Sequence, residues 1–369
     1  MDKNRDIEVL RAVAIGATIL AHVIMLLPNP SSLLMRINST FNFTVGVDLF
    51  FVVSGFVITR SLLTRVYARG NRSSKKVLAD FWLKRAYRLL PAAWFWLVLI
   101  SIYVYFMGYP FGPERNFVNT LQPIVASMMN VMNLYSSYCI EDTSSSGCFS
   151  FFYLNSHYWS LSLEEQFYFI YPLLFLFLPR RVLLASAIII IIGLFFVKRP
   201  FLSYGWHFRV DGLCWGVLIG LFSISKKYST LSIFIHNNKF LIRLLSYGLL
   251  LSLFWWTSVI LSPAATAEIY GLSMVAAISA LIVFLATFDI GMFGRWAKNS
   301  RILSYFGSRS YSIYLSHMIV FILFKATWGV GFPHLDGRME NLVVLVLGLI
   351  GVLICSEFTF QHVEKRFRR

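Results

Sequence analysis

Residues 90–108 read LPAAWFWLVLISIYVYFMG, a stretch without a charged side chain. A helix of about 20 such residues crosses the roughly 30 Å of hydrocarbon in a bilayer. Similar runs recur along the 369-residue chain, which is 57% hydrophobic and 14% charged with a mean hydropathy of +0.68. Soluble domains average about 25% charged residues. The composition excludes a soluble globular enzyme, a secreted disulfide scaffold and a disordered chain. A β-barrel is excluded because its strands are about 10 residues of alternating polarity. We therefore predict an all-α, polytopic integral membrane protein.

The apolar runs predict ten spanning helices, at about 7–27, 44–65, 90–108, 157–178, 182–197, 207–222, 240–261, 266–288, 304–327 and 340–360. With the N-terminus inside, 25 of the 33 Lys and Arg residues lie in inner segments and seven in outer loops. This bias follows the positive-inside rule and predicts that both termini are cytoplasmic. It also explains the net charge of +16. Nucleic-acid binding explains that charge less well, because no basic patch is large enough to form a domain.

One apolar segment does not fit this topology. Residues 117–135 (FVNTLQPIVASMMNVMNLY) lie in the predicted extracytoplasmic loop 109–156. If they formed a span, every later loop would change sides and the charge bias would disappear. Their Asn and Gln residues also make them more polar than the other runs. We expect an interfacial or re-entrant helix here, and an eleven-span arrangement remains the alternative.

We expect a single transmembrane domain, 1–369, with an uncleaved first helix and no appended soluble domain. Cys214 and Cys355 lie in predicted spans and are expected to pack there. Cys139 and Cys148 share the outer loop, where a disulfide can form. No cysteine or histidine spacing typical of a metal site is present, so no metal is expected.

Ionisable groups at membrane depth are costly and are candidates for function. Arg11 and His22 are 11 residues apart, which is three helical turns plus about 20°, so they share one face and lie roughly 16 Å apart along the axis. This spacing suits a ligand with an anionic head and a reactive group deeper in the membrane. Alternatively, Arg11 extends to the inner headgroups and His22 bonds a neighbouring helix.

Three carboxylates are further candidates. Asp48, in GVDLFFVVSGF (46–56), is expected at a depth similar to His22, where it could fix the imidazole tautomer, or it caps its helix. Gly46, Ser54 and Gly55 suit close helix packing. Glu164 and Glu165, in HYWSLSLEEQFY (157–168), point about 100° apart, so at least one of them faces the interior or a water-filled cavity. Such a Glu can act as an acid or a base.

Two basic groups precede the third span. In DFWLKRAYRLLP (80–91), Arg85 and Arg88 are neighbours on an amphipathic helix. Paired guanidinium groups bind phosphate, but they also anchor a helix to anionic lipid.

Two weaker groups are candidates for substrate binding. Arg209 and Asp211 open the sixth span and could pair with each other. Tyr314 and His317 are three residues apart in SYSIYLSH (310–317), with His317 near mid-membrane. A purely structural role is the alternative for both groups.

These segments together resemble acyltransferase family 3, the integral-membrane acyltransferases that modify bacterial surface glycans. The resemblance runs from about residue 5 to 360. It rests on an Arg-x10-His pair (Arg11, His22), the segment 46–56, an RxxR loop (Arg85, Arg88), a WSL-x-x-E-x-QFY segment that contains Glu164, and an SY-x-x-YL-x-H segment at 310–317. Some relatives carry an extra esterase-like domain, so a second acyl-handling step would need a partner protein here.

The resemblance implies an O-acetyltransferase of the bacterial inner (plasma) membrane. Acetyl-CoA would be the donor, held by Arg11, Arg85 and Arg88. A hydroxyl of a lipid-linked or surface glycan, O-antigen (lipopolysaccharide) above all, would be the acceptor. His22 would act as general base or as a nucleophile, oriented by Glu164 or Asp48. Intramembrane ionisable groups are also typical of a glycolipid or anion transporter or flippase, and an inactive scaffold is a third alternative.

Overall fold

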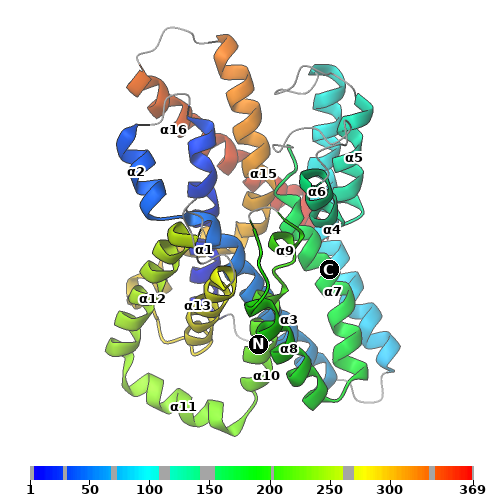
Figure 1. Cartoon of the computed structure of the whole chain (residues 1–369), viewed down its shortest axis with the longest axis vertical. Helices are drawn as coiled ribbons and strands as arrows, with labels where there is room; N and C mark the ends of the chain where they lie inside the picture. Colours follow the sequence, from blue (N-terminus) through cyan, green and yellow to red (C-terminus); the bar gives the residue numbers. More distant parts are fainter. Residues whose placement is uncertain are drawn as a thin grey trace.

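A computed structural model describes residues 4–27, 31–67, 73–107, 117–141, 154–200, 203–260, 270–331 and 337–367. These ranges are helical and contain no β-strand, in agreement with the predicted fold class (Figure 1). The elements are α1 (Arg5–Leu26), α2 (Ser32–Thr40), η1 (Phe43–Val45), α3 (Gly46–Tyr67), α4 (Ser74–Met107), α5 (Phe117–Met128), α6 (Met132–Glu141), α7 (Tyr158–Phe177), α8 (Arg180–Phe195), α9 (Tyr204–His207), α10 (Val210–Phe222), α11 (Lys226–Asn237), α12 (Lys239–Ile260), α13 (Gly271–Ala286), α14 (Gly294–Asn299), α15 (Arg301–Gly331), α16 (Gly337–Phe358), the π-helical turn η3 (Thr359–Glu364) and α17 (Lys365–Phe367).

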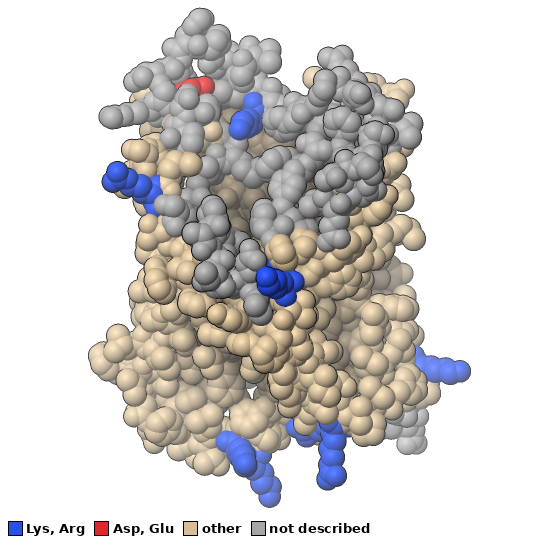
Figure 2. Space-filling model, viewed as in Figure 1, with Lys and Arg blue, Asp and Glu red and all other residues tan. Residues whose placement is uncertain are grey.

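Length and apolarity identify some of these helices as membrane spans. Within the described residues, four helices are long and apolar enough to cross a bilayer, at Phe43–Tyr67, Ser74–Met107, Lys239–Val259 and Met339–Phe367. A fifth is added if α9–α10 and α11, which meet at 94°, count as one broken span. The predicted spans 182–197 and 266–288 correspond to α8 and α13, which have 16 residues each. The described surface in Figure 2 is mostly uncharged, with single Lys and Arg side chains scattered from its upper to its lower end.

Helix α4 joins two features that the sequence analysis treated separately. The amphipathic segment 80–91 and the run 90–108 form one continuous helix through Pro91. Arg85 and Arg88 therefore lie on the same helix as the apolar run. Because a helix is stiff over this distance, the packing of α4 fixes where both guanidinium groups point.

The segment 117–135 forms a helical hairpin. Helices α5 and α6 have 12 and 10 residues, so neither is long enough to span a bilayer alone. Asn130 makes the turn between them with a φ of 55°. The turn docks on α7, where Gln166 Nε2 donates to the carbonyl oxygen of Asn130 at 2.8 Å. Gln166 lies eight residues, or about 12 Å, into α7. The interfacial or re-entrant position of this segment stays a prediction.

Cysteine pairing can be followed in part. Cys139 in α6 is disulfide-bonded, and Cys214 and Cys355 are free thiols. Cys148, the partner that the sequence suggests for Cys139, lies outside the described residues.

Two close helix contacts hold α3 at the centre of the molecule (Figure 1). A Cβ atom on Gly46 would lie 2.3 Å from the carbonyl oxygen of Ala14 in α1. A Cβ atom on Gly55 would lie 2.2 Å from that of Leu213 in α10. Glycine is needed at both positions because the backbones approach too closely for a side chain. The packing role predicted for Gly46 and Gly55 is thus confirmed.

Candidate active site

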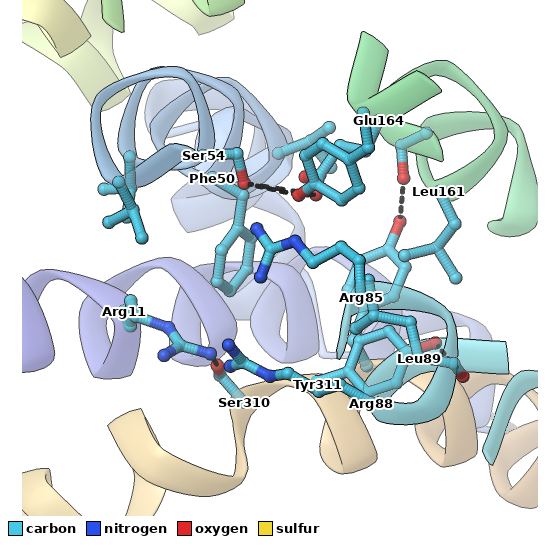
Figure 3. Close-up of a pocket in the computed structure, with 16 residues that line it drawn as sticks. Arg11, Phe50, Ser54, Arg85, Arg88, Leu89, Leu161, Glu164, Ser310 and Tyr311 are labelled. Atoms are coloured by element: carbon cyan, nitrogen blue, oxygen red, sulfur yellow. Dashed lines mark hydrogen bonds between the residues drawn. The ribbon is translucent and has the colours of Figure 1, made fainter. Parts of the chain in front are cut away.

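A pocket lies where five helices meet, and it contains about 750 Å³ of empty space including the part open to solvent. The pocket is hereafter the arginine pocket (Figure 3). Its described lining comprises Arg11 of α1, Val47, Phe50, Val53, Ser54 and Val57 of α3, Arg85, Arg88 and Leu89 of α4, Ser160, Leu161, Glu164 and Tyr168 of α7, and Ser310, Tyr311 and Tyr314 of α15.

Three guanidinium groups converge in this pocket. Nη2 of Arg11 donates to Oγ of Ser310 at 2.9 Å. Arg88 reaches toward the same serine in Figure 3. The Arg85 guanidinium carbon lies 4.4 Å from the centre of the Tyr168 ring. With Glu164 as the one carboxylate in the described lining, the pocket is net positive and suits an anionic ligand. The three arginines that the sequence analysis assigned to one ligand are brought together.

Glu164 faces the arginine pocket and is held by two hydroxyl groups. Its Oε2 accepts from Oγ of Ser54 at 3.1 Å and from the hydroxyl of Tyr168. The sequence predicts only a helix-packing role for Ser54, and its hydrogen bond to Glu164 could not be foreseen from the local pattern. Glu165 lines a neighbouring pocket, which shares Arg85 and Tyr168 with the arginine pocket. Of the two adjacent glutamates, Glu164 lines the arginine pocket and Glu165 does not.

His22 pairs with another histidine. Its Nδ1 lies 2.9 Å from the carbonyl oxygen of Thr18 and 3.2 Å from Nε2 of His317. In turn, Nδ1 of His317 lies 2.7 Å from the carbonyl oxygen of Tyr314. Because carbonyl oxygens only accept, both neutral rings carry their proton on Nδ1. His317 Nε2 is then an acceptor for His22, and Nε2 of His22 is left as a basic nitrogen. Among the described residues, no carboxylate is hydrogen-bonded to His22.

A third histidine, His157, joins this pair. It precedes α7 and is 4% exposed, and its ring centre lies 5.4 Å from that of His317. Its Nε2 lies 3.3 Å from the carbonyl oxygen of Leu315, while its buried Nδ1 has no hydrogen-bond partner within the described ranges. The sequence analysis did not single out His157, although it opens the HYWSL segment. The position of this histidine at the start of a segment of polar and aromatic residues could have marked it as a candidate.

Tyr314 separates the arginine pocket from the histidines. It lines the pocket, and its ring centre lies 5.5 Å from that of His317. Its hydroxyl is 2.6 Å from Oγ of Ser160 and donates to the carbonyl oxygen of His157 at 3.1 Å. Phe50 meets it edge to face, with ring centres 6.3 Å apart. His22 is not among the described residues that line the pocket, and it is connected to Tyr314 through His317, whose ring centre lies 5.1 Å from that of His22.

The remaining candidates form buried ion pairs elsewhere. Oδ2 of Asp48 lies 2.8 Å from Nη1 of Arg209, and Oδ2 of Asp211 lies 2.9 Å from Nη2 of Arg199. Arg209, the residue before α10, does not pair with Asp211, because each of the two binds another partner across the helix interface. Asp48 does not meet His22, because it lies about 200° around α3 from Phe50, which faces the arginine pocket. All four charged side chains are at most 4% exposed.

Known proteins resemble nearly the whole chain. The model of an acyltransferase domain family, acyltransferase 3, matches residues 4–357. O-acetyltransferase OatA of Staphylococcus aureus (strain NCTC 8325 / PS 47) is 24% identical over 344 residues, covering 88% of this chain and 52% of the relative. Putative O-acetyltransferase SACOL0978 of S. aureus (strain COL) is 26% identical over 354 residues with the same coverage.

The chain spans about half the length of these curated relatives. No solved structure matches it. The family match covers the helices that form the arginine pocket and the histidine cluster, from α1 through α15. The chain belongs to the acyltransferase 3 family.

Proposed function

We propose that this protein is a membrane O-acetyltransferase that moves an acetyl group from cytoplasmic acetyl-CoA to a hydroxyl of an extracytoplasmic glycan, with O-antigen as the first candidate acceptor. One observation carries the proposal. A pocket with three arginines ends at Tyr314, and the His22–His317 pair lies behind that residue. An anion-binding region and a basic nitrogen are therefore adjacent, as a phosphate-bearing acyl donor requires.

The arginine pocket provides the donor site in this proposal. The diphosphate of CoA would lie among Arg11, Arg85 and Arg88, whose planar guanidinium groups match phosphate oxygens. The pantetheine arm would extend along α1 and α3 toward Tyr314. Because Tyr314 and Phe50 close that end of the pocket, a rotation of these rings would let the thioester reach His22.

His22 has two routes to transfer. As a general base, its Nε2 takes the proton of the acceptor hydroxyl while the hydroxyl oxygen attacks the thioester carbonyl. The carbon–sulfur bond then breaks and CoA leaves as its thiolate. As a nucleophile, Nε2 first attacks the thioester carbonyl, so that the carbon–sulfur bond breaks, CoA leaves as its thiolate and an acyl-imidazole forms. The acceptor hydroxyl then attacks this acyl group, the carbon–nitrogen bond to His22 breaks, and the released Nε2 takes the hydroxyl proton. In both routes Nδ1–H of His22 donates hydrogen bonds to the Thr18 carbonyl oxygen and to His317 Nε2. These acceptors hold the ring in place and stabilise the positive charge that develops on it.

The protein would lie in the inner membrane with ten spans and both termini cytoplasmic, and the relative directions of the helices support the number of spans. Helices α1 and α15 are parallel, because residue numbers increase in the same direction along both. Glu8 contacts Ser304 near one end, and His22 contacts His317 further along. The same holds for α3 and α10, from Asp48 with Arg209 to Gly55 with Leu213. In the ten-span topology, the first and ninth spans run in the same direction, as do the second and sixth.

The test compares the surface glycans of cells that express the wild type or His22→Ala. The mass should increase by one acetyl group per modified hydroxyl only with the wild type, and mild alkali should remove it. Binding of acetyl-CoA by the purified protein is measured alongside. A protein that inserts normally, binds no acetyl-CoA and modifies no glycan would contradict the proposal.

A further inference from the structure

One face of α3 is lined by cavities over much of its length. Residues at intervals of three or four positions line them in turn, namely Val47, Phe50, Ser54, Val57, Ser61 and Arg65. These intervals define a single helical face, and the 18 helical steps from Val47 to Arg65 cover about 27 Å. The arginine pocket occupies the Val47 end. Two further pockets adjoin it toward Arg65, and Arg11 and Val57 line all three.

The two additional pockets contain a second group of basic side chains. Arg65 and Lys84 line both of them, and Arg60 lines the larger one. Nη1 of Arg60 donates to Oγ of Ser223 at 3.1 Å, and Nε of Arg65 donates to Oγ of Ser61 at 3.4 Å. In the described part of the chain, none of these three side chains is ion-paired with a carboxylate. This group is hereafter the second basic cluster.

The acidic residues of these pockets are directed at other partners. Asp289 lies 3.0 Å from Nζ of Lys298 and accepts from the backbone amides of Arg5 and Asp6. Glu8 accepts from Oγ of Ser304. The positive charge of the second basic cluster is therefore free to act on a ligand.

Two basic clusters, contributed by α1, α3 and α4, follow one another along the pockets beside α3 and suit a ligand with two separate anionic groups. From Val57, which borders the arginine pocket, to Arg65 is eight residues, or about 12 Å. CoA carries a diphosphate and, on its ribose, a separate 3′-phosphate. We propose that the second basic cluster, Arg60, Arg65 and Lys84, is a binding site for the 3′-phosphate of the CoA donor, while Arg11, Arg85 and Arg88 hold the diphosphate. This inference rests on the proposed function.

The assignment has a consequence for donor specificity. A 3′-phosphate held by two or three basic side chains contributes binding free energy that dephospho-CoA cannot supply. The site would then discriminate between these two compounds. A charge-assisted hydrogen bond of the usual strength corresponds to roughly a 10- to 100-fold change in affinity.

The test is binding of CoA and of dephospho-CoA to the purified, detergent-solubilised full-length protein. We expect the wild type to bind CoA at least about tenfold more tightly. Arg65→Gln and Lys84→Gln should weaken CoA binding and leave dephospho-CoA binding unchanged, so that the discrimination falls. Lys227→Gln is the matched control, because Lys227 is an exposed lysine of α11 that lines none of these pockets.

Other results of this binding experiment would contradict either the 3′-phosphate site or the proposed function. Equal binding of both compounds by the wild type overturns the 3′-phosphate site and leaves the proposed donor standing. If Arg65→Gln and Lys84→Gln weaken the binding of CoA and of dephospho-CoA equally, the 3′-phosphate site is also overturned. These residues would then shape the pocket without contacting the 3′-phosphate. Binding of neither compound by the wild type contradicts the proposed function itself.

Discussion

Nδ1 of His22 lies 3.2 Å from Nε2 of His317, although 295 residues separate the two in the chain. The direction of this hydrogen bond follows from the backbone, since each Nδ1 also faces a carbonyl oxygen of its own helix. The pair therefore replaces the imidazole–carboxylate arrangement that the sequence analysis expected. Here a neutral histidine accepts the hydrogen bond from the imidazole Nδ1 that a carboxylate accepts in serine hydrolases.

His22→Ala should lower acetyl transfer by at least 10²- to 10⁴-fold, because the only proposed proton acceptor is removed. Acetyl-CoA binding should change little, since His22 does not line the arginine pocket. Transfer rate and binding are measured on the same membrane preparation. A variant that keeps wild-type transfer would exclude His22 from the reaction.

His317→Gln should retain at least about tenfold more activity than His317→Leu. The Gln amide can accept from His22 Nδ1 and donate to the Tyr314 carbonyl, as His317 does, whereas Leu can do neither. Expression and thermal stability of both variants serve as controls. Equal losses in the two variants would show that the side chain fills space and does not position His22.

Arg85→Gln and Arg88→Gln should each raise KM for acetyl-CoA by about 10- to 100-fold with a smaller change in kcat. Contacts to a phosphate remote from the thioester are made equally in the ground state and in the transition state, so their loss appears in KM. Steady-state kinetics over a range of acetyl-CoA concentrations measure both constants. An unchanged KM would favour lipid anchoring by these arginines.

Tyr314→Ala should increase hydrolysis of acetyl-CoA in the absence of an acceptor. The ring forms the wall between the arginine pocket and His22, and without it water can reach both. Tyr314→Phe keeps the ring and loses only the contacts to Ser160 and His157, so its hydrolysis should stay close to the wild-type level. Release of free CoA reports hydrolysis directly. Equal hydrolysis in the two variants would contradict a role for the ring as a wall.

Asp48→Asn should destabilise the protein by about 3–5 kcal/mol, because Arg209 is left buried without its counter-charge. The double variant Asp48→Leu/Arg209→Met should recover most of that loss. Thermal unfolding in detergent measures both effects. Full stability of Asp48→Asn together with loss of transfer would return Asp48 to a catalytic role.

Periodicity and charge in the sequence were sufficient to predict the helices and some of the site. Predicted and observed boundaries agree within a few residues for the first, fourth and seventh spans, because long apolar runs bounded by polar residues define a helix locally. The shared face of Arg11 and His22 also follows from helical geometry alone, and both side chains do contact α15. Likewise, the i, i+3 spacing placed Arg85 and Arg88 together on one pocket.

The partner of each side chain was decided by the tertiary structure. Asp48 and Arg209 are 161 residues apart, and the close contact of α3 with α10 at Gly55 brings them together. The meeting of His22, His157 and His317 depends in the same way on how α1, α7 and α15 pack. A helical pattern fixes the direction of a side chain relative to its own axis. The neighbouring helix that it faces depends on packing between segments distant in the chain, which the local pattern does not contain.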